Sequence, residues 1–224
     1  LYDFANQPYP TIIITFVYSS FFTHDLAKNY QNADSLWLFA ISICAIIIAL
    51  LSPIMGAIAD RSGYRKTYLI ACTWICVIST LFLYFPQPGQ IWFALILVVI
   101  SNAAFEMGQV FCNSYLPDIA PKNKIGRISG YGWSFGYIGG LIGLAICLVV
   151  FYFPEKPFNP FTGNLLNKEN YEHIRSMPLF ISMWFAFFSL PTFIFLKDRK
   201  REKLSVESIR KSYNNLLSTF KEIK

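Results

Sequence analysis

The feature that most constrains this sequence is a set of long intervals without a single Asp, Glu, Lys or Arg. A helix needs about 20 mainly apolar residues to cross a bilayer, and each interval reaches that length. The interval 67–105 is too long for one crossing. The stretch PQPG at Pro86–Gly89 divides it, because proline cannot continue a helix and glycine turns readily. The sequence therefore predicts six membrane-spanning helices, with expected bounds 4–23, 35–59, 67–85, 90–116, 128–153 and 176–196.

The composition favours a membrane protein with an all-α fold. Hydrophobic residues make up 54% of the chain and charged residues 14%, whereas soluble domains carry about 25% charged residues. The five cysteines fall inside apolar intervals, where they are typical of small buried residues rather than of a disulfide framework. No histidine or acid joins Cys72 and Cys76, so we expect no metal site and no cofactor.

Lys and Arg are distributed unevenly over the predicted loops. The loops after the second and fourth spans hold three each and the tail after the sixth holds nine, against four on the opposite side. Cytoplasmic loops carry an excess of Lys and Arg, so both ends of the sequence are expected in the cytoplasm. The net charge of +6 is then a topology signal, and nucleic acid is not an expected partner. The Ile- and Lys-rich composition favours a bacterial source, so the expected location is the bacterial inner membrane.

The sequence divides into two parts by composition. Residues 1–196 form the predicted six-span bundle, and residues 197–224 form a basic tail. Apolar residues recur in the tail at helical spacing between charged ones, which predicts an amphipathic linker helix on the cytoplasmic surface.

Polar residues lie along one side of the fourth predicted span. Asn102, Glu106, Gln109 and Asn113 are spaced i, i+4, i+7 and i+11, which places them on one helix face. A carboxylate facing lipid would be costly, so this face is expected to point into the protein or a water-filled cavity. One interpretation is a structural carboxyl group bonded to a neighbouring helix. The other, which we favour, is a group that contacts substrate or carries a proton.

Two other spans carry polar or small residues at helical spacing. The first opens with YDFANQPYP, in which Asn6 and its neighbours either line a pathway or bond to another helix. In the fifth span, GYGWSFGYIGGLIGL, Trp133 and Tyr137 share a face that either lines a cavity or packs. Glycines of this span repeat every fourth residue, which predicts close helix packing. They are Gly132, Gly136, Gly139, Gly140 and Gly143.

The loop after the second span, GAIADRSGYRK, combines an acid, several basic residues and glycines. Asp60 is expected at the end of its helix, where the helix dipole disfavours an acid, so it needs another partner. Basic neighbours on the same side of the membrane offer one, and such an ion cluster can latch one conformation. The predicted gate motif consists of Gly56, Asp60, Arg61, Gly63, Arg65 and Lys66.

This loop resembles the signature between the second and third spans of the major facilitator superfamily. YDFANQPY is similar to the YDWANSAY opening of its Atg22-like branch, which includes vacuolar amino-acid effluxers and bacterial UMF1 proteins. The segments NAAFEMGQVFCNSYLPDIAP and GRISGYGWSFGYIGG also resemble that branch. Phe4 in place of Trp, Gln7 and Pro8 in place of Ser-Ala, and Cys112 in place of Tyr depart from it. These departures bear on a substrate pocket more than on the fold.

The resemblance implies a twelve-helix transporter made of two six-helix halves, with substrate bound between them. This chain is then expected to be the amino-terminal half with part of the linker, and its partner the missing carboxy-terminal half. Glu106 with Asn102 and Asn113 would face or support the cavity, and the gate motif would act as the cytoplasmic latch.

We therefore expect a secondary active transporter that moves small polar solutes, with amino acids as one candidate class, by alternating access. A membrane enzyme is disfavoured, because His24 and His173 fall in loops and no HExxH, GxSxG or P-loop pattern occurs. No catalytic residue is predicted. The remaining alternative is a non-transporting structural or interaction subunit of a membrane complex.

Overall fold

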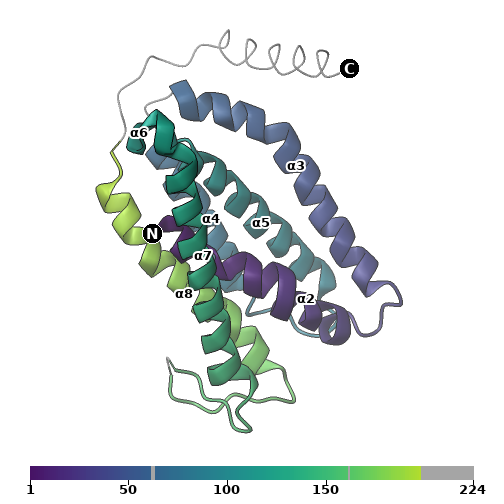
Figure 1. Cartoon of the computed structure of the whole chain (residues 1–224). Helices are drawn as coiled ribbons and strands as arrows, with labels where there is room; N and C mark the ends of the chain where they lie inside the picture. The colour runs from purple at the N-terminus through teal and green to yellow at the C-terminus, as the bar shows by residue number, and fades with distance from the viewer. Residues whose placement is uncertain (62–63, 161, 198–224) are drawn as a thin grey trace.

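The computed structural model is a bundle of helices (Figure 1). It describes residues 1–61, 64–160 and 162–197, with the side chains of 57–61 excluded. The predicted linker helix falls at 198–224, apart from Lys197, and so lies outside the described residues. Between the last helices, an isolated antiparallel bridge joins Phe158 to Leu165.

The first segment is helical but irregular. Pro8 and Pro10 have no N–H to donate to the carbonyl groups one turn earlier, and this interrupts the α-helical pattern. π-helical stretches extend the irregularity along the segment. The pieces are α1 (Tyr2–Asn6), a π-helical stretch at Pro10–Phe16, α2 (Val17–Phe21) and a second π-helical stretch at Phe22–Leu26.

Five long helices and one short helix follow the first segment in the described chain. The long ones are α3 (Ala33–Arg61), α4 (Arg65–Phe82), α5 (Ile91–Asn113), α7 (Ile125–Ile146) and α8 (Glu172–Phe195), and the short one is α6 (Leu116–Ile119). A 3-10 turn at Lys122–Lys124 precedes α7, and a π-helical stretch at Cys147–Tyr152 follows it. The turn between α4 and α5 contains Gly89 at φ 94°, a left-handed conformation that glycine adopts without strain. α5 packs against both α4 and α3.

Within the described residues, four helical stretches are long and apolar enough to cross a membrane. The described chain is therefore that of a multi-pass, all-helical membrane protein. Helices occupy all the intervals that the sequence predicted as spans, but the count of six crossings stays a prediction. The four stretches are Ala33–Gly56, Ile91–Ile119, Lys122–Tyr152 and Glu172–Phe195.

α1 and α7 approach each other closely. A Cβ atom added at Gly139 would lie 2.5 Å from the carbonyl oxygen of Phe4, and one at Gly143 would lie 2.9 Å from Cβ of Pro8. Gly136 and Gly140 also face this segment, at 3.1 and 3.0 Å from its nearest atoms. The absence of side chains at these positions lets the two backbones meet.

Candidate functional site

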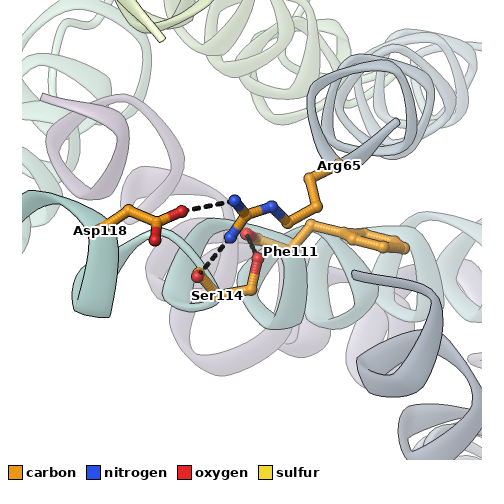
Figure 2. A network of polar contacts seen from close by, with 4 residues as sticks. All are labelled: Arg65, Phe111, Ser114 and Asp118. Carbon is orange, nitrogen blue, oxygen red and sulfur yellow. Dashed lines mark hydrogen bonds and ion pairs between the residues drawn. The ribbon is translucent and has the colours of Figure 1, made fainter. Parts of the chain in front are cut away.

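The guanidinium group of Arg65, in the first turn of α4, joins residues from two other elements (Figure 2). Arg65 is only 2% exposed. Its Nη1 donates to the backbone carbonyl oxygen of Ser114 at 2.8 Å, and its Nη2 pairs with the carboxylate of Asp118 in α6. Its Cζ lies 4.6 Å from the centre of the Tyr115 ring. An ion pair, a hydrogen bond and a cation–π contact therefore tie the start of α4 to the end of α5 and to α6.

Local packing fixes the end of α5 beside this arginine. Tyr68, one turn after Arg65, stacks on Phe111 with ring centres 5.3 Å apart. The hydroxyl group of Ser114 donates to the carbonyl oxygen of Phe111 at 2.7 Å (Figure 2). The Ser114 carbonyl group that accepts from Arg65 thus lies on a helix end that is itself packed against α4.

Arg65 belongs to the predicted gate motif, and the structure describes only part of that motif. Gly56 lies within α3, where nothing is within 4 Å of an added Cβ atom, and Lys66 is half-buried. Gly63 and the side chains of Asp60 and Arg61 lie outside the described residues. Whether Asp60 joins this cluster stays a prediction.

Asp118 was not among the predicted site residues, although the sequence contains a signal for it. The third and fourth predicted spans form an antiparallel hairpin, so the start of one and the end of the other lie at the same end of the bundle. Arg65 shortly precedes the third predicted span and Asp118 shortly follows the fourth. The sequence interpretation used this loop only for its basic residues and did not pair the acid with the opposite arginine.

The polar face predicted on the fourth span belongs to α5, and its members differ in burial. Asn102 is buried, and its Nδ2 donates to Sγ of Cys44 in α3 at 3.2 Å. Glu106 and Gln109 are half-buried, and Asn113 is exposed. The face therefore begins as a contact with α3 and becomes open toward the α6 end of the helix.

Asn6 is fully buried, yet both polar atoms of its side chain lack a hydrogen-bond partner among the described residues. It shares a helix face with Tyr2 and Tyr9. The Tyr2 hydroxyl group lies 2.8 Å from Oγ1 of Thr73 in α4, and that of Tyr9 lies 2.7 Å from Oγ of Ser101 in α5. Asn6 is thus placed on the side of the first segment that faces α4 and α5.

The aromatic pair predicted on the fifth span lies on α7. Trp133 and Tyr137 are exposed, with ring centres 6.1 Å apart. A Cβ atom added at Gly132 would lie 2.7 Å from a carboxylate oxygen of Asp3. Asp3, which was not among the predicted site residues, therefore lies against α7 where Gly132 leaves room.

Within the part of the chain that the structure describes, no group of three His, Cys, Asp or Glu residues could hold a metal ion. The arrangement offers an interhelical ion pair at one end of the bundle and half-buried polar groups along the helices. Such groups suit the binding of polar solutes and the exchange of contacts between helices.

Comparisons with known proteins follow the same direction. A family model described as "Vacuole effluxer Atg22 like" matches residues 23–127 and 120–224. The uncharacterized MFS-type transporter YxiO of Bacillus subtilis is 27% identical over 228 residues, which cover 100% of this chain and 51% of the relative. Autophagy-related protein 22 of Chaetomium globosum is 34% identical over 86 residues, which cover 38% of this chain and 13% of the relative.

A solved structure shares the fold. The xylose transporter XylE from E. coli, in its inward-open conformation, matches with a TM-score of 0.66 over 88% of this chain and 47% of its own. At 15% sequence identity this likeness concerns the fold alone. The chain spans about half the length of YxiO and of XylE.

Proposed function

Because this chain belongs to the family of Atg22-like vacuole effluxers, which are transporters of the major facilitator type, we propose that it forms one half of a secondary active transporter. That transporter would move small polar solutes by alternating access. In this proposal the described helices make a six-span half, and a second half of similar size completes the cavity. Both ends of the chain would lie in the cytoplasm, and the membrane would be a bacterial inner membrane.

The observation that supports this proposal most directly is the contact between Arg65 and Asp118. In alternating access, helices at one rim of the bundle separate while those at the other close. An ion pair between side chains of different helices can form in one state and open in another, whereas a backbone hydrogen bond within a helix persists. The α6 end of the bundle, which holds Arg65 and Asp118, would then be the cytoplasmic rim where the latch acts.

Solute recognition is assigned to the polar face of α5 and its surroundings. Glu106 is half-buried and, within the described residues, has no cation beside it. The ring of Tyr9 in the first segment lies 5.3 Å, centre to centre, from that of Phe105, the residue before Glu106, so these two helices meet near it. Asn102, Gln109 and Asn113, with Trp133 and Tyr137 of α7, are proposed as supporting groups. Amino acids, which carry both an ammonium and a carboxylate group, are the solute class to test first.

The experiment uses the full-length parent protein in proteoliposomes. A proton gradient is imposed, and uptake and release of a mixed amino-acid pool are followed for wild type, Glu106→Gln and a matched control, Glu155→Gln, which removes an exposed loop charge. We expect gradient-driven flux in wild type and Glu155→Gln and its loss in Glu106→Gln. Equal flux in all three would return Glu106 to a structural role. No flux of any amino acid in any variant would contradict the proposed solute class.

A further inference from the structure

A cavity of about 350 Å³ lies at the end of the bundle opposite Arg65. The first segment packs on α7 through α1, but its far end packs on α3 instead, so the first segment and α7 diverge toward this end (Figure 1). The volume lies within the range of about 300–1,000 Å³ that small-molecule pockets occupy. The cavity is therefore large enough for a small organic ligand. Its lining residues are Phe16, Val17, Ser20, Phe21, Asp25, Leu144, Leu148, Tyr152 and Ile174.

All the described π-helical stretches border this one cavity. Phe16 ends the first stretch, Asp25 lies in the second, and Leu148 and Tyr152 lie in the third. A π-helical turn widens a helix by one residue and re-aims the side chains around it, and such turns occur frequently at functional sites. Their convergence on one cavity distinguishes this place from the rest of the bundle.

The lining defines the chemistry of a ligand. Most of the walls are aliphatic or aromatic, and of the described residues that line the cavity only Asp25 carries a charge. Phe16 and Tyr152 are 59% and 47% exposed, so their ring surfaces are available beside the carboxylate. A carboxylate attracts an ammonium group, and aromatic faces attract the same group through their quadrupole. This combination fits a cation with an apolar body.

A residue from outside the lining interacts with Asp25. Tyr171, which precedes α8, has its ring centre 5.5 Å from that of Phe21. The Asp25 carboxylate raises the pKa of Tyr171, because hydrogen bonding to the carboxylate and its negative charge both favour the neutral phenol. Tyr171 has φ 56°, a left-handed backbone conformation that is rare for a bulky side chain. Such strain persists where the surroundings fix it, as they do at binding sites.

One cation lies near the rim and provides an internal control. Nζ of Lys168 donates to the backbone carbonyl oxygen of Tyr152 at 3.3 Å, and Lys168 is exposed and does not line the cavity. Its charge opposes that of Asp25 at the same mouth. Removing the Asp25 charge should therefore weaken the binding of a cation, and removing the Lys168 charge should strengthen it.

We propose that this cavity is a binding site for small organic amines, with the ammonium group at Asp25 and the apolar body against Phe16, Leu144 and Leu148. The site is separate from the Arg65 cluster and from the polar face of α5. Binding there does not require that the protein transport the ligand, so the site can be tested apart from the proposed function.

The test measures binding to the full-length parent protein in detergent by calorimetry. The probe is 2-phenylethylamine, and its matched controls are 2-phenylethanol, which is neutral, and 3-phenylpropionate, which is anionic. We expect the amine to bind at least about tenfold more tightly than the alcohol, because a hydrogen-bonded charge pair contributes that much or more. The anion is expected to bind most weakly.

Variants locate the binding to this cavity. Asp25→Asn is expected to weaken amine binding about tenfold and to leave the alcohol unchanged, and Lys168→Gln is expected to strengthen amine binding severalfold. Asp34→Asn removes an exposed carboxylate in the first turn of α3 and should change nothing. Ser20→Trp fills the cavity without removing a charge and should abolish binding of both amine and alcohol.

The proposal is overturned by any of three results. These are no measurable binding of the amine to wild type, equal binding of amine and alcohol, and amine binding that survives both Asp25→Asn and Ser20→Trp. Thermal unfolding of each variant separates a loss of the site from a loss of the fold. If Asp25→Asn unfolds, Ser20→Trp and Lys168→Gln still decide the outcome.

Discussion

Two buried arginines lie near the opposite ends of α4: Arg65 in its own first turn, and Arg175 of α8 beside its other end. Each lies over a tyrosine ring, but their hydrogen-bond partners differ in kind. Arg65 pairs with the Asp118 carboxylate and one backbone carbonyl group. Arg175, at the start of α8 and 8% exposed, donates from Nε to the carbonyl oxygen of Tyr84 at 2.7 Å and from Nη2 to that of Phe85 at 3.3 Å. Within the described residues, Arg175 has no carboxylate partner.

The ion pair of Arg65 is a contact that helices can exchange when they move, whereas the bonds of Arg175 to backbone carbonyl groups act as an anchor. Tyr84 and Phe85 lie in the turn that follows α4, and buried backbone carbonyl groups need a donor, so Arg175 satisfies groups that would otherwise lack partners. The hydroxyl group of Tyr18 reaches the same helix end, at 3.3 Å from the carbonyl oxygen of Leu83. The first segment, α4 and α8 therefore meet at this end through backbone acceptors. At the other end, α4 is held by an ion pair between side chains, which can open when helices separate.

Asp118→Ala, which removes the ion pair, is expected to have the largest effect on stability and flux. Among the described residues, removal of the carboxylate leaves the buried Arg65 charge without an ionic partner, which costs about 3–5 kcal/mol in comparable buried pairs. We expect a marked fall in the midpoint of thermal unfolding of the full-length protein in detergent, together with loss of solute flux per folded molecule. Asp34→Ala, which removes an exposed acid, serves as the control.

A double variant separates the charge from the packing. Arg65→Met combined with Asp118→Leu replaces the pair by apolar groups, and such replacements are often neutral or stabilising. We expect the free energy of unfolding to return to within about 1 kcal/mol of the wild-type value while flux stays lost. A double variant as unstable as Asp118→Ala would show that the ion pair contributes net stability, and one with normal flux would exclude the latch.

The sequence was sufficient for the helical membrane class but not for these contacts. Intervals without charge identify helices that lie in lipid, because the bilayer excludes charged groups whatever the neighbouring helices are. The carbonyl groups that Arg175 binds belong to the backbone after α4, and no residue type marks them in the sequence. Arg175 was therefore counted only as one of the few basic residues on its side of the membrane.

The polar residues show the same limit. Asn6 lies on the side of the first segment that faces α4 and α5, whereas Asp3, three residues earlier, lies against Gly132 of α7. Helical periodicity gives the relative direction of two side chains on one helix. It does not give the rotation of that helix against its neighbours, and the π-helical stretches change that rotation along the first segment.

A smaller effect is expected at the anchoring end. Arg175→Met removes hydrogen bonds from a charged donor to Tyr84 and Phe85, and we expect a loss of about 2 kcal/mol in unfolding stability. Flux per folded molecule should stay unchanged, because no carboxylate is released and the latch remains. Arg127→Met, which removes an exposed arginine bonded to the Tyr131 hydroxyl group, is the matched control. If Arg175→Met abolished flux as Asp118→Ala does, the two ends would not differ in role.

The smallest effect tests which part of the Arg175 environment forms the anchor. The Arg175 Cζ lies 5.1 Å from the centre of the half-buried Tyr84 ring, and a cation–π contact of this kind contributes about 0.5–1 kcal/mol. Tyr84→Leu removes the ring but keeps the backbone carbonyl group, so we expect a loss within that range in thermal unfolding, whereas Tyr84→Phe should be neutral. A loss as large as that of Arg175→Met would make the ring the main partner of the arginine. The anchor would then depend on a side chain, as the contact at Arg65 does, and the contrast between the two ends would have to rest on charge alone.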